Sequence, residues 1–81
     1  MHQYKIHYLA DQDDGDPKFF TRASPLQVGE VIELPETSFF HVVVRFHSLK
    51  TCTRVDLSKS AQNPQEAIDL AKQMRHWPGR G

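Results

Sequence analysis

Residues 39–47 carry apolar side chains on both faces of a predicted strand, and this feature limits the folds open to the chain. Alternation along the strand places one wholly apolar set on one face: Phe40, Val42, Val44 and Phe46. The opposite face is mixed: Phe39, His41, Val43, Arg45 and His47. A strand with apolar residues on both sides is covered twice, in the centre of a sheet, in a barrel or at an interface. A chain of 81 residues builds one modest core, so few elements are available to cover it.

Four shorter stretches also have the composition of strands. They lie at residues 3–9, 18–23, 30–34 and 51–58. In the first of them, Tyr4, Ile6 and Tyr8 alternate with polar residues, which is typical of a half-buried strand. Residues 48–50 make a tight connection, so the two strands on either side of them are expected to pair as an antiparallel hairpin.

The end of the sequence predicts one helix. Asn63 is a good N-cap, Pro64 suits the first helical position, and Glu66 completes a pattern that resembles a capping box. Apolar residues then recur at helical spacing: Ala67, Ile68, Leu70, Ala71 and Met74. We expect the helix to run from Pro64 to about residue 76 and to end before Pro78.

These elements predict the α+β class. We expect a strongly bent antiparallel sheet of about five strands, forming a small half-open barrel with the C-terminal helix packed on it. A flat sheet with the helix on one face is the alternative. Residues 1–77 are expected to form a single small domain, and residues 78–81 a flexible C-terminal tail.

The composition is that of an ordinary globular domain, with 38% hydrophobic and 25% charged residues. The longest apolar run, residues 42–44, is far shorter than the roughly 20 residues needed to span a bilayer. The first three residues do not begin a secretion signal. Cys52, the single cysteine, cannot form an internal disulfide, which favours a reducing compartment. We therefore expect a cytoplasmic protein without a membrane partner.

Charge is balanced in total but not along the chain. Residues 1–40 hold seven acidic and three basic side chains, and residues 41–81 hold three acidic and seven basic ones. A zero net charge argues against an obligate nucleic-acid binder, which usually has a basic domain. The second half can still form a local basic surface, unless the two halves neutralise each other within the fold.

Metal sites are not expected. An EF-hand loop at residues 11–16 and beyond would need an oxygen ligand at its fifth position and a glutamate at its twelfth, where the chain has Gly15 and Arg22. His41 and His47 share a predicted strand face, but six residues of strand separate them by about 20 Å, too far for one ion. The sequence therefore predicts neither a metal nor another cofactor.

An enzyme is not expected either. Cys52 lies between Lys50 and Arg54, and positive charge nearby is typical of reactive thiols. A thiol enzyme would also need a positioned base, and the sequence contains none of the common catalytic motifs. Cys52 is better explained as a small strand residue, and a thiol enzyme centred on it is the third alternative.

The function we expect is that of a small non-catalytic binding or accessory module. Its partner would be another protein or a second copy of this chain, as a homodimer, because the mixed strand face needs cover. The residues expected to bind this partner are those of that face: Phe39, His41, Val43, Arg45 and His47.

The alternative is an RNA- or single-stranded DNA-binding protein that uses the basic second half. The residues that would contact nucleic acid are Arg45, Lys50, Arg54, Trp77 and Arg80. Trp77 lies among cations and would stack on a base, or it folds back on the apolar stripe of the helix. The second arrangement of Trp77 is the one we favour.

Overall fold

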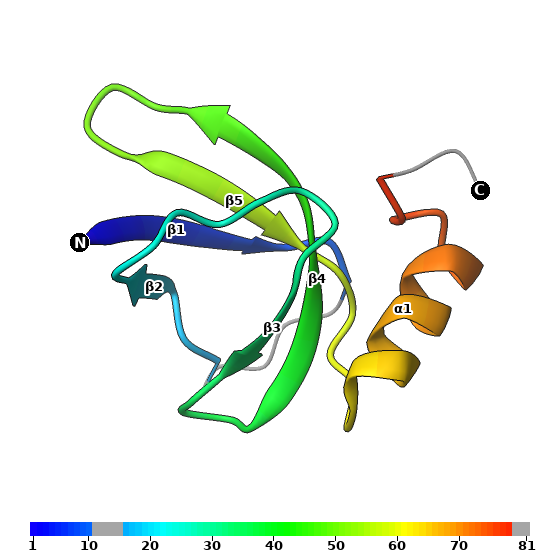
Figure 1. The fold of residues 1–81 in the computed structure, drawn as a ribbon. Helices are drawn as coiled ribbons and strands as arrows, with labels where there is room; N and C mark the ends of the chain where they lie inside the picture. Colours follow the sequence, from blue (N-terminus) through cyan, green and yellow to red (C-terminus); the bar gives the residue numbers. More distant parts are fainter. Residues whose placement is uncertain (11–15, 79–81) are drawn as a thin grey trace.

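The sheet of the computed structural model has the strand order β2-β1-β5-β4-β3, and the structure describes residues 1–10 and 16–78 (Figure 1). Its strands are β1 (His2–Tyr8), β2 (Phe19–Arg22), β3 (Val31–Leu34), β4 (Phe39–Ser48) and β5 (Thr53–Leu57). Within the described residues, one helix, α1 (Pro64–Gln73), follows the sheet. The predicted α+β fold, with about five strands and a C-terminal helix, is confirmed.

One strand pairing differs from the antiparallel sheet expected from the sequence. β1 runs parallel to β5, while the other three neighbouring pairs are antiparallel, so the sheet is mixed. Parallel neighbours need a long connection, and here β2, β3 and β4 all lie between the two strands in the chain. Alternation of side chains shows which residues share a face, but it does not show which strands become neighbours.

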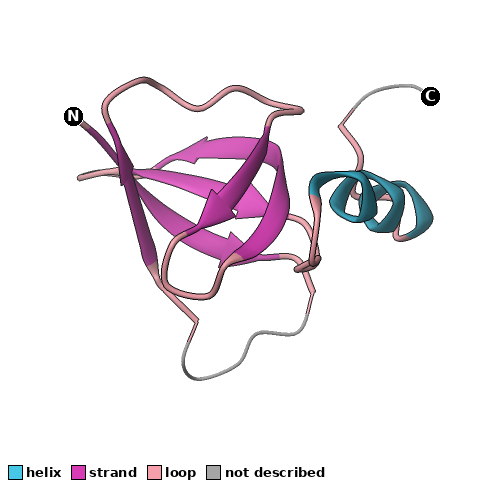
Figure 2. Ribbon diagram, turned by 60° about the horizontal axis from the view of Figure 1, so that its bottom comes forward, coloured by secondary structure: helices cyan, strands magenta, loops and turns pink. Residues whose placement is uncertain are grey.

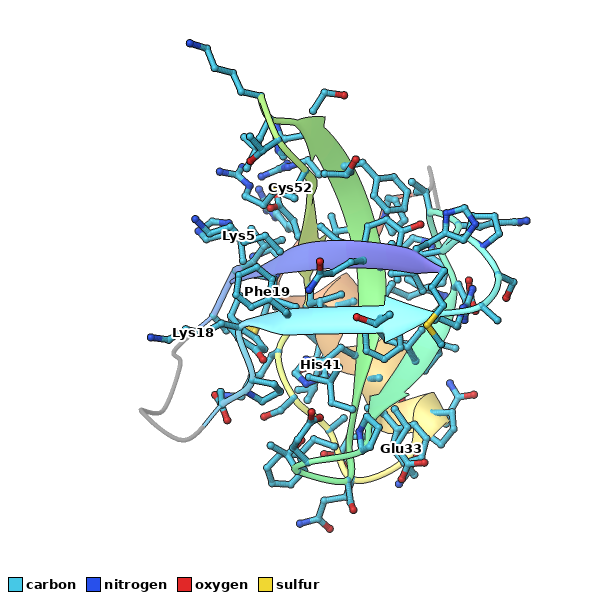
Figure 3. The ribbon with its side chains drawn as sticks, turned by 90° about the vertical axis from the view of Figure 1, so that its left-hand side faces the viewer. Lys5, Lys18, Phe19, Glu33, His41 and Cys52 are labelled. Carbon is cyan, nitrogen blue, oxygen red and sulfur yellow. The ribbon has the colours of Figure 1, made fainter. Side chains whose placement is uncertain are left out.

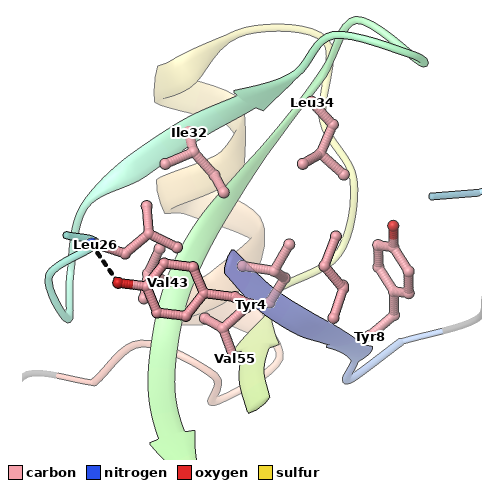
Figure 4. Close-up of a cluster of buried hydrophobic side chains, with 9 residues drawn as sticks. Tyr4, Tyr8, Leu26, Ile32, Leu34, Val43 and Val55 are labelled. Atoms are coloured by element: carbon pink, nitrogen blue, oxygen red, sulfur yellow. Dashed lines mark hydrogen bonds between the residues drawn. The ribbon is translucent and has the colours of Figure 1, made fainter. Parts of the chain in front are cut away.

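The sheet curls until it nearly closes into a barrel around the main core (Figures 2 and 4). The buried members of this core are Tyr4, Ile6, Tyr8, Leu26, Ile32, Leu34, Val43, Val55 and Leu57. Leu26 is held in place because its backbone N–H donates to the Tyr4 hydroxyl at 3.0 Å, the dashed line in Figure 4. Between the two edge strands, Arg22 at the end of β2 forms a bidentate ion pair with Glu30, just before β3. The curl therefore covers the barrel-facing side of β4 within one chain.

A β-bulge between Val43 and Arg45 reverses the alternation of side chains along β4. Val43 is opposite Leu57 of β5, and Arg45 is opposite Asp56, the adjacent residue of that strand. Two steps along β4 thus correspond to one step along β5. Val43 belongs to the main core and Phe46 packs against it, so the core-facing positions are three residues apart. The prediction that Val43 and Arg45 share a face was wrong, because the extra residue is not visible in the sequence pattern.

The helix α1 packs on β3 and β4, on the side of the sheet away from the main core (Figure 1). Asn63 caps it as predicted, with its Oδ1 accepting the backbone N–H of Glu66 at 2.8 Å. The helix ends at Gln73 rather than near residue 76, and Arg75 has a φ of 60°, a left-handed conformation that does not continue a helix. With its ten residues α1 is too short to cross a membrane, and the described residues contain no helix that is long and apolar enough to do so.

Candidate functional site

Asp56 has no exposed side-chain surface, although it lies on β5 at a position that faces outward from the barrel. Four basic side chains from three strands cover its carboxylate. From β4, Arg45 Nε lies 2.7 Å and His47 Nε2 3.1 Å from Asp56 Oδ2. His7 Nδ1 of β1 lies 3.1 Å from Oδ1, and Arg54 Nε of β5 lies 3.2 Å from the same oxygen. We call these five residues the Asp56 cluster.

The pKa of Asp56 lies below its ordinary value. Burial raises this pKa, but the hydrogen bonds from Arg45, His7 and His47 and the charge of Arg54 together lower it by more. The carboxylate is therefore ionised at neutral pH, and an ionised carboxylate only accepts hydrogen bonds. It follows that His7 donates from Nδ1 and His47 from Nε2. Arg54 pairs with Asp56 through its charge, since its buried Nε has no hydrogen-bond partner in the described part of the chain.

The side chains that cover Asp56 remain partly exposed. The exposed fraction is 59% for Arg45, 51% for His7, 41% for His47 and 32% for Arg54. Each side chain presents one edge to the carboxylate and the rest to solvent. Two guanidinium charges against one carboxylate leave a positive surplus at the surface, and the contacts with Asp56 restrain these side chains before any ligand arrives.

Lys5 and Phe19 extend the cluster across the sheet. In the strand register, Phe19 of β2 is opposite Lys5 of β1, and Lys5 is opposite Arg54 of β5. Arg54 is in turn opposite His47 of β4. Neighbouring strands lie about 4.8 Å apart, so these four side chains form a row roughly 14 Å long. Phe19, at one end of the row, is 52% exposed, and Figure 3 shows it beside Lys5.

The helix leaves this surface uncovered. α1 contacts β3 and β4, and Figure 1 shows it at the far end of the barrel from the β4–β5 hairpin. The β4 residues of the cluster lie in the half of the strand that forms this hairpin. We call the uncovered surface the basic outer face; its members are Lys5, His7, Arg45, His47 and Arg54, with Asp56 buried beneath them.

The residues expected to bind a protein partner do not form one surface. His41 is 3% exposed and Val43 is fully buried, because the curled sheet encloses both of them. Phe39 is 39% exposed at the start of β4. Arg45 and His47 lie beyond the bulge and belong to the basic outer face. The expectation of a continuous strand face was wrong at His41 and Val43, since the chain itself supplies their cover.

The residues of the nucleic-acid alternative are only partly brought together. Arg45 and Arg54 both contact Asp56, and Lys50 is exposed in the turn between β4 and β5. Trp77 lies elsewhere. It packs beside α1 against a second core, formed by Val42, Ala61, Ala67 and Ala71, and Lys72 Nζ lies 5.2 Å from its ring centroid. Trp77 thus folds back on the helix, the arrangement that the sequence favoured. Arg80 lies outside the described residues.

Lys5, His7, Phe19 and Asp56 were not among the site residues predicted from the sequence. The alternation of β1 does place Lys5 and His7 on its polar side, but only the parallel pairing with β5 brings them to Arg54 and Asp56. One signal was present in the sequence: Asp56 is the sole acidic residue between Glu36 and Glu66, in the basic part of the chain. A lone carboxylate among cations marks a place where those cations converge.

No group of three or more His, Cys, Asp or Glu side chains in residues 1–10 and 16–78 is arranged to hold a metal ion. Of the acidic segment 11–16, only Asp16 belongs to the described residues. Cys52 is half-buried in the turn before β5, where its carbonyl accepts the backbone N–H of Leu49 at 2.8 Å.

A shallow depression of about 560 Å³ lies beside the loop between β2 and β3. Arg22 and Glu30 supply its charged lining, and they are paired with each other. Arg22 also donates to the carbonyl oxygens of Ser24 and Pro25. Since these contacts occupy Arg22, the depression offers less positive charge to a ligand than the basic outer face does.

Comparison of the chain with protein-family models, with curated proteins and with solved structures finds no match.

Proposed function

We propose that the protein binds single-stranded RNA or DNA through the basic outer face. The observation that carries this proposal is the position of Arg45 and Arg54 on adjacent strands, both tied to the buried carboxylate of Asp56 and both partly exposed. Arginine side chains held in this way are suited to phosphate, which accepts hydrogen bonds from the planar guanidinium group. Lys5 adds a third permanent positive charge to the same surface.

The shape and composition of the surface favour a single strand. Proteins that bind single strands combine a positively charged track with aromatic side chains on which bases stack. Phe19 is an exposed aromatic residue at the end of the row that continues through Lys5 and Arg54. A broad sheet face of this kind does not enter the major groove of a duplex, which admits a helix or a narrow two-stranded ribbon.

The balanced net charge sets the expected strength of binding. The chain has a formal net charge of zero, so attraction comes from the local face rather than from the whole molecule. Three permanent cations contacting three phosphates give a slope of about −2 for log K against log salt on a single strand. We expect dissociation constants in the range of about 10⁻⁴–10⁻⁶ M at physiological salt.

An acidic protein is the competing partner for the same surface. The expectation of a protein partner or a homodimer relied on cover for Phe39 and Val43, and Val43 is already buried within the chain. A protein partner for the basic outer face would instead carry carboxylates. Its binding would survive nuclease treatment of a cell extract, whereas nucleic acid would be lost.

Fluorescence anisotropy with a labelled oligouridylate and a labelled oligothymidylate tests the proposal. Lys5→Gln should weaken binding and reduce the magnitude of the salt slope by about 0.7, because one phosphate contact is lost. Phe19→Leu should weaken binding by about 1–3 kcal/mol if the ring stacks on a base. Lys59→Gln, in the exposed segment before α1, is the matched control and should change neither quantity. Absence of salt-dependent binding to both oligonucleotides, or equal effects of Lys5→Gln and Lys59→Gln, would overturn the proposal.

A further inference from the structure

His7 and His47 face the buried carboxylate from two different strands, and each uses one ring nitrogen for it. His7 of β1 donates from Nδ1 at 3.1 Å, and His47 of β4 donates from Nε2 at 3.1 Å. Both imidazoles are about half exposed, at 51% and 41%. The other ring nitrogen, Nε2 in His7 and Nδ1 in His47, is not bonded to Asp56.

We propose that protonation of His7 and His47 tightens the binding of phosphate to the basic outer face, so that affinity for a single strand rises as the pH falls from 8 to 6. This inference rests on the proposed function and names a regulation of the same site. Histidine is the side chain whose charge changes in this pH range. The structure accommodates the change because each imidazole takes its second proton on the nitrogen that is not bonded to Asp56, and neither existing hydrogen bond has to break.

Protonation of both histidines doubles the formal positive charge of the basic outer face. Lys5, Arg45 and Arg54 against Asp56 give a formal charge of +2, and two imidazolium groups raise it to +4. Asp56 stays ionised throughout, because its pKa lies below the ordinary value of a carboxylate. Each imidazolium also brings a new N–H donor, which makes a stronger hydrogen bond to phosphate when it carries charge.

The charged groups around the two histidines come from three strands. They are Lys5 from β1, Arg45 from β4, and Arg54 and Asp56 from β5, while Lys50 and Cys52 lie in the turn that joins β4 to β5. Lysine, arginine and carboxylate side chains keep their charge between pH 6 and 8. His41 is enclosed in the barrel, and His2 lies on the side of β1 that carries Tyr4. The pH response of the face is therefore assigned to His7 and His47.

The decisive variant replaces both histidines by amides that keep the hydrogen bonds to Asp56. Asn at position 7 places an amide N–H near the position of Nδ1, and Gln at position 47 reaches the position of Nε2. The double variant His7→Asn/His47→Gln thus retains both donors and removes both titrations. His2→Gln, on the opposite side of β1, is the matched control.

The experiment measures the affinity for a labelled oligouridylate by fluorescence anisotropy at pH 6 and pH 8, at constant ionic strength. For the unmodified chain and for His2→Gln, we expect affinity to be about five-fold higher at pH 6, with a steeper salt dependence. The double variant should have nearly equal affinities at the two pH values. Circular dichroism at both pH values checks that the barrel remains folded.

Three results would overturn the inference, and they are distinguishable. Salt-dependent binding with equal affinity at pH 6 and pH 8 would reject the pH regulation and leave the proposed function standing. A pH response that persists in His7→Asn/His47→Gln would assign it to other groups. Absence of binding at both pH values would reject the proposed function and the regulation together.

Discussion

His41 donates a hydrogen bond from Nδ1 to the carbonyl oxygen of Ser58, 2.8 Å away, inside the barrel. The two residues join β4 to the segment that follows β5, and further contacts strengthen the junction. Ser58 Oγ accepts the backbone N–H of Val42 at 2.7 Å, and the Ser58 N–H donates to the Val42 carbonyl at 3.0 Å. The ring of His41 also lies 5.6 Å from that of Tyr8, between centroids. A neutral imidazole is therefore a structural part of the core.

Acidification should destabilise the protein through His41. Burial lowers the pKa of this imidazole, although the hydrogen bond to Ser58 and the charge of Asp16 act in the opposite direction. A depressed histidine pKa means that the unfolded chain binds more protons, so stability is present above the ordinary value of about 6.5 and is lost as the pH falls below it. Urea titrations should show a falling free energy of unfolding between about pH 7 and pH 5.

His41→Gln identifies the source of this effect. The variant is expected to be less stable at pH 7, because a polar core contact is altered, but its stability should depend less on pH between 7 and 5. The test compares how steeply the free energy of unfolding falls with pH in the two proteins, not their stability at a single pH. An unchanged slope in His41→Gln would assign the loss of stability to another histidine.

Asp56 should control stability at lower pH. Its pKa is depressed, so its contribution is complete above the ordinary carboxylate value of about 3.9 and is lost as the pH falls through the lower value in the folded protein. Asp56→Asn is expected to lower the free energy of unfolding at pH 7 by about 2 kcal/mol. This is less than the 3–5 kcal/mol typical of breaking a fully buried pair, because solvent can hydrate the exposed cations that remain.

The pH dependence of Asp56→Asn distinguishes this account from simple loss of packing. As the pH falls below about 3.9, the stability of the unmodified chain should begin to approach that of the variant, because the unfolded chain then binds a proton that folded Asp56 does not. Urea titrations of both proteins at pH 7 and pH 3.5 measure the difference. A constant difference between them at the two pH values would contradict a charge-based role for Asp56.

Asn63 should stabilise α1 as its N-cap, a role already predicted from the sequence. Asn63→Ala removes the oxygen that accepts the backbone N–H of Glu66, and should cost about 1 kcal/mol of stability. Gln62→Ala, at the exposed preceding position, is the matched control and should be nearly neutral. If chemical denaturation gives equal losses for both variants, the cap does not stabilise the docked helix.

Local signals in the sequence predicted the elements well, because each element depends on residues close in the chain. Asn63 and Pro64 marked the start of the helix, and alternation identified each of the five strands to within about two residues. The apolar residues on both sides of β4 correctly indicated that the strand is covered twice. They could not distinguish cover by a curled sheet from cover by a second chain, since both satisfy the same pattern.

The candidate site depended on two features that the sequence did not reveal. The bulge between Val43 and Arg45 moved Arg45 to the outside, and one extra residue in a strand leaves no mark on a local apolar pattern. The parallel pairing of β1 with β5 brought His7 to Asp56, which is 49 residues away in the chain. Both features depend on strand register, which long-range packing decides.

Because the backbone N–H of Leu26 donates to the Tyr4 hydroxyl, the stability of the loop before β3 should depend on that oxygen. Tyr4 is 7% and Leu26 5% exposed, so the backbone N–H of Leu26 has no ready access to water in place of the Tyr4 hydroxyl. Tyr4→Phe keeps the ring, which lies 5.8 Å from that of Phe46 between centroids, and leaves this donor without its partner. The expected loss of stability is about 1–3 kcal/mol, the cost of an unsatisfied buried polar group. Hydrogen exchange should report faster exchange at Leu26 in the variant, and an exchange rate equal to that of the unmodified chain would show that the hydroxyl does not hold the loop.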